Sequence, residues 1–316
     1  MRILITGVTG LIGSHLADFV IAKGHRVWGV RRFRSDNKNI EGIKKLKIIN
    51  GEITDPTSVE KAVAISNPDI IFHLAGQSYP AESWSAPEYT MNVNLTGTLR
   101  VLEAARKMRK SPKVFIACSS AEYGLTKKLP TTEDTLLKPV SPYGVSKLAA
   151  EALGYQYFIN YKIPVFLGRF FIQVGPGQDE RTSIQTFCKQ MVLAEKSKSK
   201  KIILVGNLKP KRDFLDVRDG VAAAWAMVTK GKPGETYNIC SGKAPTMNEV
   251  LKTVISKGNT QVTVKIDPER LRPTDEPVIW GSNAKIFKDT GWKPKIAITD
   301  TIYRVLNYWR QRVNQA

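Results

Sequence analysis

The sequence has few of the residues that build several common classes of protein. Its 316 residues include three cysteines, Cys118, Cys188 and Cys240, without CxxC spacing. This excludes a disulfide framework and a structural zinc site, and we expect three core thiols and no metal. No apolar stretch approaches the roughly 20 residues that cross a bilayer. The hydrophobic content of 42% is enough for a sizeable core, which excludes a disordered chain.

Acidic residues are also scarce: 28 Asp and Glu stand against 48 Lys and Arg, a formal charge of +20. Only residues 44–47 and 195–204 are densely basic, and neither stretch interleaves aromatic residues. We therefore expect no nucleic-acid partner and interpret the charge as a solvated, lysine-rich surface. The alternative is a positive field that attracts a small phosphorylated ligand. The N-terminal stretch MRILITGVTG has regularly spaced glycines, which suit a strand and turn better than a signal peptide. This predicts a cytoplasmic protein with no membrane attachment.

The first half of the chain alternates strand and helix patterns. Apolar strand-like runs occupy 2–7, 25–30, 45–51, 69–76 and 113–120, and helical patterns occupy 11–24, 57–66 and 91–109. This rhythm predicts an α/β fold, a Rossmann-type doubly wound parallel sheet. The later sequence is irregular and rich in Pro and Gly, which predicts a smaller C-terminal substrate-binding lobe. We expect the sheet domain to span 1–168, with 213–242 rejoining it, and the lobe to span 169–212 and 243–316.

Three glycines mark the first strand-to-helix turn. The stretch GVTGLIG places Gly7, Gly10 and Gly13 between the first strand and the helix that follows. Glycines here let the backbone approach a pyrophosphate, which rests on amide groups at the positive end of the helix dipole. An isolated trio would indicate no more than a tight turn. In this position it predicts a dinucleotide site.

The second strand ends in arginine where a NAD-binding protein usually carries an acidic residue. The stretch is VRRFRS, with Arg31 and Arg32 directly after the apolar run. Guanidinium groups bind a ribose 2'-phosphate through charge-assisted hydrogen bonds. This favours NADP(H) and leaves NAD(H) open, because arginines at a strand end are also ordinary solvated surface.

A tyrosine and a lysine share one helix face. In SPYGVSKLAAEAL, Tyr143 and Lys147 stand at i and i+4. A nearby cation favours phenolate and lowers a tyrosine pKa, which suits the pair to proton transfer beside a nicotinamide. The YxxxK pattern alone is common. Its signal becomes strong when it is combined with the glycine turn and with a strand, KVFIACSS, that ends in Ser119.

This combination resembles the extended short-chain dehydrogenases/reductases of the nucleotide-sugar epimerase/dehydratase family, over essentially the whole chain. The resemblance implies that Ser119 hydrogen-bonds the sugar oxygen beside Tyr143, and that Lys147 also holds the nicotinamide ribose. Helices that flank YxxxK form a dimer interface in that family, so we expect a homodimer. His73, inside the apolar run IIFHLAG, is expected to be a core histidine rather than a base.

Segments of the later sequence resemble one branch of that family, which contains GDP-mannose 4,6-dehydratases and GDP-4-keto-6-deoxy-mannose reductases. They include VGPGQ, VGNLKPKRDFLDVRD and LRPTDEPVIWGSNAKIFKDTGWKP. A dehydratase needs a further base, which the family supplies as Glu two residues after the catalytic Ser or Thr, and Ala121 stands there in this chain. Glu122 is adjacent, but in an extended segment it would point to the opposite face. A reductase needs no such carboxylate.

The resemblance also implies the remaining site residues. At two further positions this sequence departs from the family's pattern. Ile172 replaces an asparagine that contacts substrate in the family, and Glu52 replaces an aspartate near adenine. The expected cofactor-binding residues are Gly7, Thr9, Gly10, Leu11, Ile12, Gly13, Arg31, Arg32, Glu52, Ile53, Leu74, Ala75, Gly76, Tyr143 and Lys147. The expected substrate-binding residues are Gln77, Ser78, Ser120, Gln173, Lys189, Arg212, Arg272 and Asp275.

The leading hypothesis is an NADP(H)-dependent reductase of a 4-keto-6-deoxy nucleotide sugar. We expect GDP-4-keto-6-deoxy-D-mannose as substrate and a GDP-6-deoxyhexose such as GDP-rhamnose as product. The alternative is a nucleotide-sugar 4-epimerase or 4,6-dehydratase that retains its cofactor. A non-catalytic NAD(P)-sensing binding protein is the hypothesis from another class, because a fold does not dictate a function.

Overall fold

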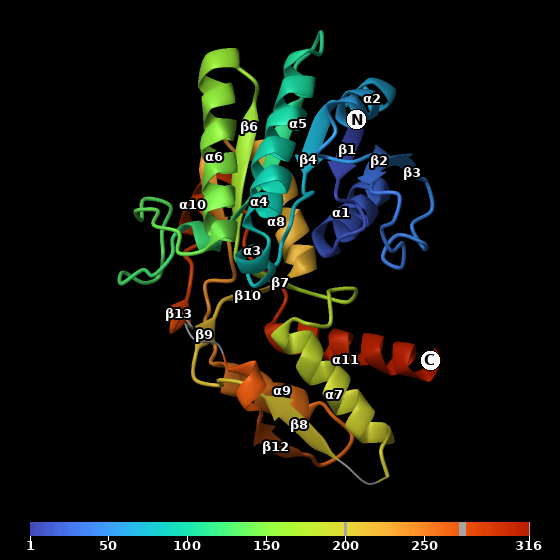
Figure 1. Cartoon of the computed structure of the whole chain (residues 1–316), viewed down its shortest axis with the longest axis vertical. Coiled ribbons are helices and arrows are strands. Elements are labelled where there is room, and N and C mark those ends of the chain that lie inside the picture. Colours follow the sequence, from blue (N-terminus) through green and yellow to red (C-terminus); the bar gives the residue numbers. More distant parts are fainter. Residues whose placement is uncertain (199–200, 272–275, 316) are drawn as a thin grey trace.

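The chain folds into an α/β body and a smaller lobe beneath it (Figure 1). The computed structural model describes residues 1–198, 201–271 and 276–315. Two of the expected substrate residues, Arg272 and Asp275, lie outside the described residues. Among the helices described, none has the length and apolar character needed to cross a membrane.

The body is built on a seven-stranded sheet in which every pair of neighbours is parallel, in the order β11-β6-β5-β4-β1-β2-β3. This confirms the predicted doubly wound parallel sheet. The strands are β1 (Arg2–Thr6), β2 (Arg26–Arg31), β3 (Leu46–Asn50), β4 (Ile70–His73), β5 (Lys113–Ser119), β6 (Val165–Phe170) and β11 (Thr236–Ile239).

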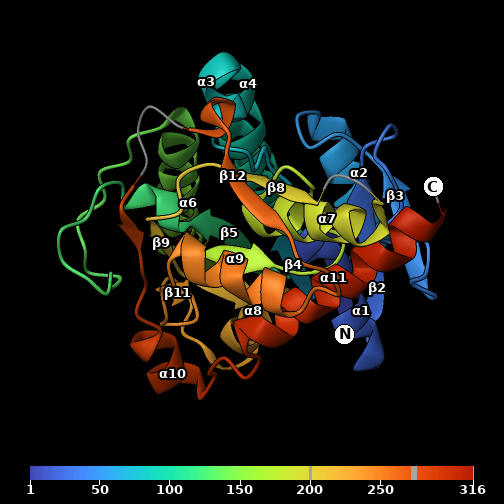
Figure 2. The same cartoon turned by 90° about the horizontal axis from the view of Figure 1, so that it is seen from below.

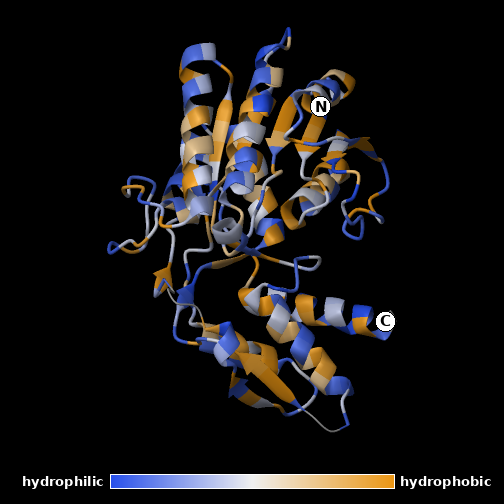
Figure 3. Cartoon of the chain, in the orientation of Figure 1, coloured by the Kyte–Doolittle hydropathy of each residue, from blue (hydrophilic) through white to orange (hydrophobic). Residues whose placement is uncertain are grey.

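Helices cover both faces of this sheet, which explains why its central strands are continuous apolar runs. On one face, α1 (Leu11–Ala22) and α8 (Val217–Lys230) pack into a core with Ile3, Phe72 and Phe115. The other face is covered by α2 (Pro56–Ser66), α5 (Gly97–Arg106) and α6 (Pro142–Tyr161). Figure 3 shows the apolar strands between these amphipathic helices.

The strand order reverses at β1, which pairs with β2 on one side and with β4 on the other. At such a switch point the loops after the two strands diverge and leave a crevice at their carboxyl ends, where open α/β sheets bind ligands. The glycine turn follows β1, and Leu74–Gln77 follow β4. The sheet therefore places the predicted cofactor residues at this crevice.

The predicted helix at 91–109 is interrupted. The chain forms α4 (Pro87–Met91), a π-helical turn at Asn92–Thr96, and then α5. Short α3 (Glu82–Ser85) precedes them. A π turn widens the helix locally and is common at functional sites, and this one carries Asn94, whose side-chain bonds are described below.

The lobe has its own core and lies below the carboxyl ends of the sheet (Figure 2). Its helices α7, α9 and α11 pack against one another. The bounds are α7 (Ser183–Lys196), β8 (Ile202–Val205), α9 (Met247–Ser256), β12 (Thr263–Ile266), a 3-10 turn at Pro268–Arg270, and α11 (Ile298–Gln315). Two further small sheets join β7 (Ile172–Val174) to β10 (Phe214–Asp216) and β9 (Lys211–Arg212) to β13 (Val278–Ile279).

Two details bear on the division into domains. Residue 168 lies inside β6, and α10 (Ala284–Thr290) packs on α8 and β11 of the body. Within 213–242, β11 pairs with β6 and α8 contacts β5 and β6. All three cysteines are buried and free, which confirms the expected core thiols.

Candidate active site

Two glycines of the turn, Gly7 and Gly13, have no room for a side chain. Gly7 has φ +71°, and a Cβ there would lie 2.7 Å from the Ala75 backbone nitrogen. A Cβ on Gly13 would lie 2.3 Å from the Gly7 carbonyl oxygen. Gly10 begins α1 and has no side chain to cap it, so the N–H groups of the first turn are left for a ligand. The turn fits a pyrophosphate held by backbone amides.

The arginines at the end of β2 reach different partners. Arg31 donates from Nε to Asn50 Oδ1 at 3.0 Å and also bonds Asn37, and Arg32 donates to the Tyr89 hydroxyl at 3.1 Å. Arg32 is exposed and Arg31 is half-buried. In these contacts neither guanidinium is paired with a carboxylate. Their positive charges are therefore not compensated there and suit an anionic ligand.

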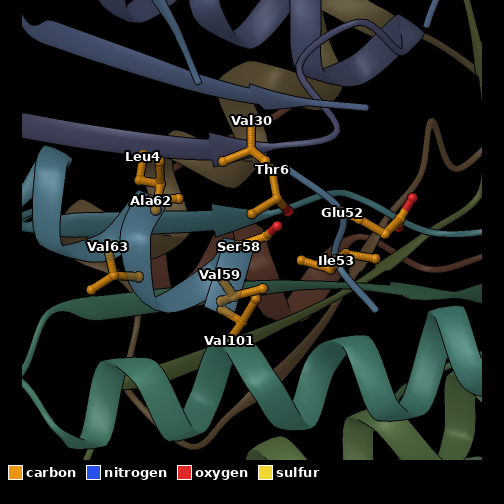
Figure 4. A pocket seen from close by; sticks show the side chains of 10 residues that line it. All are labelled: Leu4, Thr6, Val30, Glu52, Ile53, Ser58, Val59, Ala62, Val63 and Val101. Atoms are coloured by element: carbon orange, nitrogen blue, oxygen red, sulfur yellow. The ribbon is translucent and has the colours of Figure 1, made fainter. Parts of the chain in front are cut away.

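Glu52 and Ile53 follow β3 and line a small cavity between the sheet and helices α2 and α5. Figure 4 shows Glu52 at one end, with its carboxylate directed away from the apolar side chains. The other lining residues are Leu4, Thr6, Val30, Ser58, Val59, Ala62, Val63 and Val101. The cavity holds only about 10 Å³ and its apolar lining belongs to the buried core, so it is too small for a purine ring. The roles of Glu52 and Ile53 toward adenine stay predictions.

Asn94 ties the loop after β4 to the catalytic helix. Its side chain accepts from the Gln77 backbone N–H at 2.8 Å and donates to the Gln77 carbonyl at 3.1 Å. It also donates to the Ser146 hydroxyl at 2.9 Å, which itself donates to the Tyr143 carbonyl at 2.7 Å. The sequence analysis missed Asn94. Asn94 stands among other polar residues, Asn92 and Thr96, so nothing in the local sequence distinguishes it.

His73 is a core histidine, as predicted. Its Nδ1 bonds the Thr6 hydroxyl at 2.8 Å and its Nε2 bonds the Thr98 hydroxyl at 3.0 Å. Burial lowers the pKa of His73 to about 3, and the Lys147 charge acts in the same direction. The ring is therefore neutral at physiological pH and links β1, β4 and α5.

Ser119, Tyr143 and Lys147 meet at the end of β5. Ser119 is the last residue of that strand, while Tyr143 and Lys147 lie on successive turns of α6, whose N-terminus is capped by Ser141. The Lys147 Nζ donates to the Ala117 carbonyl at 2.9 Å. A Cβ on Gly76 would lie 3.4 Å from this Nζ. The structure thus brings the lysine to the loop that follows β4.

Burial raises the pKa of Tyr143 to about 12, and a side-chain hydrogen bond with Ser119 opposes this raise. The sequence predicted that Lys147 would lower this pKa. In the structure Ser119 does so, because the Lys147 ammonium is bonded to Ala117. Burial lowers the pKa of Lys147 itself. The phenol is therefore protonated at neutral pH, as a proton donor must be.

The segment after Ser119 is a 3-10 turn, Ser120–Glu122, and not the extended strand on which the sequence argument depended. Glu122 is nevertheless 0% exposed, and its carboxylate contacts the Ser119 backbone and Arg169. Its Oε1 accepts the Ser119 backbone N–H at 2.7 Å, while the Ser119 hydroxyl accepts the Ala121 N–H at 3.2 Å. This is a capping box, and the S-x-x-E pattern at 119–122 was its signal in the sequence.

Glu122 belongs to a buried charge cluster behind the site. Arg169 on β6 bonds both carboxylate oxygens of Glu151, and its Nε lies 3.4 Å from Glu122 Oε2. Cys118, Glu122 and Glu151 place possible metal ligands within 4.8 Å of one another. The Arg169 guanidinium already supplies the cation there.

The expected substrate residues are less closely assembled. Gln77 is buried, and its side-chain oxygen has no hydrogen-bond partner among the described residues. Gln173 turns its side-chain oxygen toward Gly220 of α8. Lys189 on α7 pairs with Glu180 at 2.7 Å, and Arg212 donates to the Lys211 and Glu276 carbonyls. Their substrate roles, with those of Ser78 and Ser120, stay predictions.

Comparison with known proteins identifies relatives over the full chain. Residues 4–305 match the family model described as GDP-mannose 4,6 dehydratase. A GDP-6-deoxy-D-mannose reductase from Pseudomonas aeruginosa is 31% identical, over 99% of this chain and 99% of that protein. A GDP-mannose 4,6-dehydratase from Vibrio cholerae is 29% identical, over 95% of this chain and 91% of that protein.

Two solved structures match the fold with similar quality. The structure of RMD from Pseudomonas aeruginosa complexed with NADPH has a TM-score of 0.87 and 28% identity, covering 99% of this chain and 100% of that one. A Thermus thermophilus UDP-glucose 4-epimerase complexed with NAD has a TM-score of 0.88 and 26% identity, covering 98% and 99%. These matches agree with the glycine turn and with the grouping of Ser119, Tyr143 and Lys147. The chain therefore belongs to the GDP-mannose 4,6-dehydratase family of extended short-chain dehydrogenases/reductases.

Proposed function

We propose that this protein uses NADPH to reduce the 4-keto group of GDP-4-keto-6-deoxy-D-mannose, giving a GDP-6-deoxyhexose such as GDP-rhamnose. The observation that carries the proposal is the site itself. Ser119, Tyr143 and Lys147 are together, while Ala121 supplies no carboxylate and Glu122 is buried behind the strand end. This set serves ketone reduction and lacks the base that dehydration requires. The reductase relative from Pseudomonas aeruginosa supports the same reading.

The residues have distinct tasks in this reaction. The glycine turn fits the cofactor, whose bound nicotinamide supplies the hydride. Ser119 donates a hydrogen bond to the C4 carbonyl oxygen and polarises it, and the protonated Tyr143 phenol gives that oxygen its proton. Lys147 holds its ammonium beside Gly76 and binds the nicotinamide ribose, while the Ser119 hydrogen bond stabilises the phenolate that remains. We place the nucleotide-sugar site in the lobe, at 169–212 and 243–316.

The direct test is loss of NADPH absorbance when the purified protein meets GDP-4-keto-6-deoxy-D-mannose. The proposal expects one NADPH oxidised per sugar reduced. A protein that leaves NADPH unchanged but converts GDP-mannose without added cofactor would instead be a dehydratase. Parallel binding of GDP, UDP, CDP and dTDP identifies the base independently of the reaction.

A 4-epimerase with retained cofactor is the second candidate function. It is favoured by the Thermus thermophilus epimerase structure, which matches this fold as well as the reductase structure does. An epimerase returns the hydride to the same sugar, so it needs the same Ser, Tyr and Lys and keeps its cofactor through purification. An NAD(P)-sensing binding protein is the third, and turnover of any nucleotide sugar excludes it.

The arginines at the end of β2 predict the choice of cofactor. Arg32→Ala is expected to raise the Kd for NADPH about 10-fold or more and to leave the Kd for NADH unchanged, because charge-assisted bonds to the 2'-phosphate are lost. Fluorescence titration of both cofactors measures this. Arg26→Ala, at the amino end of the same strand, is the matched control. Equal losses for NADPH and NADH would contradict the assignment.

We propose a homodimer that forms through α5 and α6. Tyr155 is 51% exposed and Ile159 is 43% exposed on α6, and Leu99 on α5 is 38% exposed. Light scattering should give twice the 35.2 kDa of one chain. Substitution of Tyr155 and Ile159 together by Lys should yield monomers. Phe287→Lys, at an exposed apolar residue on α10, should stay dimeric.

We also propose a cytoplasmic location. Its support is the free state of the three buried cysteines, which suits a reducing compartment. Fractionation of the producing cells tests it, and recovery of the enzyme outside the cytoplasmic fraction would contradict it.

A further inference from the structure

Glu122 holds the backbone of the catalytic serine from behind. The residue is 0% exposed and follows Ser119 by one 3-10 turn. Its Oε1 accepts the Ser119 N–H at 2.7 Å. Ser119 is the last residue of β5 that pairs with β6. The direction of the Ser119 hydroxyl therefore depends on the side chain of Glu122.

The same carboxylate is fixed to the two elements that flank the site. Arg169 comes from β6, the strand that pairs with β5 at Ser119↔Phe170. Glu151 comes from α6, where it continues the helix face of Tyr143 and Lys147 at i+8 and i+4. Contacts of Glu122 and Glu151 with Arg169 thus connect the strand that carries Ser119 to the helix that carries Tyr143.

The charges of the cluster balance with one shared proton. Arg169 is 4% exposed and Glu151 is 6% exposed, so all three groups are removed from water. Two ionised carboxylates on one guanidinium would leave a buried negative charge, which is costly. Glu122 Oε2 has no hydrogen-bond partner among the described residues, and one carboxylate oxygen of Glu122 lies within 4.8 Å of one of Glu151. A proton on Glu122 that is directed to Glu151 removes both problems.

We propose that Glu122 is a positioning residue: as a neutral acid joined to Glu151 and Arg169, it orients Ser119 toward the substrate carbonyl and toward Tyr143. This inference rests on the proposed reductase function for its kinetic consequence alone. The groups that face Glu122 are Glu151, Tyr143 and Lys147 from α6, Arg169 from β6, and Cys118 from β5. Burial, followed by repulsion from Glu151, raises the pKa of Glu122, which agrees with the neutral form.

Two substitutions separate the hydrogen bonds from the charge. Glu122→Gln keeps an oxygen to accept the Ser119 N–H and an NH₂ group to donate to Glu151, so it mimics the neutral acid. Glu122→Val removes both bonds. We expect Gln to lower kcat by no more than about threefold and Val to lower it by at least about 10-fold, with the NADPH Kd unchanged, because misorientation at a reacting centre affects the chemical step.

A second readout needs no substrate. The Ser119 hydrogen bond lowers the pKa of Tyr143 in the folded protein. Titration of carbon-13-labelled tyrosine, assigned with Tyr143→Phe, should show a higher Tyr143 pKa in Glu122→Val than in Glu122→Gln. Both variants lack the Glu122 charge, which also raises this pKa, so the comparison isolates the hydrogen bonds. Val228→Ala, which opens the core on α8 far along the chain from this cluster, is the control for lost stability and should keep kcat.

Four outcomes decide whether Glu122 positions Ser119. The proposal is overturned if Glu122→Val keeps the wild-type kcat and the Tyr143 pKa of Glu122→Gln. It is also overturned if Glu122→Gln loses as much kcat as Glu122→Val, since the residue would then act through its charge. If Val228→Ala loses as much kcat as Glu122→Val at equal Tm, the role is merely structural. If the wild type fails to oxidise NADPH, the proposed function is wrong, and the tyrosine titration still judges Glu122.

Discussion

Tyr143→Phe is expected to lower kcat for NADPH-dependent reduction by about 10³-fold, the scale of a lost general acid. The phenol is buried beside Ser119, so water cannot easily deliver the proton in its place. The substitution removes one oxygen and leaves the ring packing intact. Steady-state kinetics with GDP-4-keto-6-deoxy-D-mannose measures kcat, and fluorescence titration should give an unchanged Kd for NADPH.

Tyr157→Phe is the matched control for this experiment. Tyr157 lies on the same helix, is buried, and donates its hydroxyl to Glu103 on α5, away from the crevice. We expect this variant to keep the wild-type kcat and to lose some stability through the missing hydrogen bond. A Tyr143→Phe enzyme that retains more than about a tenth of wild-type kcat would show that another group delivers the proton.

Gly13→Ala is expected to raise the Kd for NADPH by about 100-fold or more. The added methyl group would lie 2.3 Å from the Gly7 oxygen and 2.9 Å from the Val8 Cα. Both atoms are backbone, so the turn itself must move and its amide groups leave the positions that fit the pyrophosphate. Because the turn also contacts Ala75, the loop after β4 shifts with it.

Gly42→Ala provides the comparison, since a Cβ at Gly42 meets nothing within 4 Å. It should bind NADPH as the wild type does. Calorimetric titration of both variants, together with thermal unfolding, separates loss of binding from loss of fold. Unaltered NADPH affinity in Gly13→Ala would mean that the cofactor does not lie on the first turn of α1.

The sequence was sufficient wherever the local geometry depends on residues close together in the chain. The glycine turn is one such case, because its spacing alone fixes where the backbone must bend. The Tyr143 and Lys147 pair is another, because helical periodicity places i and i+4 on one face. Buried parallel strands are likewise continuous apolar runs, so the sheet followed from local pattern.

Features that depend on distant contacts could not be predicted in this way. Asn94 bonds Gln77 and Ser146, and nothing local indicates the π turn that lets it reach both. Glu122 resembles an active-site acid by position, yet its environment comes from Arg169 and Glu151, which belong to other elements. Its burial, and hence its protonation state, is a property of the assembled fold.

The order in which the sheet is completed bears on how the chain folds as it is synthesised. Strand β6 ends at Phe170, and its partner β11 begins only at Thr236, after the first segment of the lobe and α8 have been made. All six residues of β6 are buried in the finished sheet. Until β11 emerges, β6 is therefore an unprotected apolar edge, which is the kind of surface that aggregates. Chains arrested or cut within this interval are natural clients for chaperones.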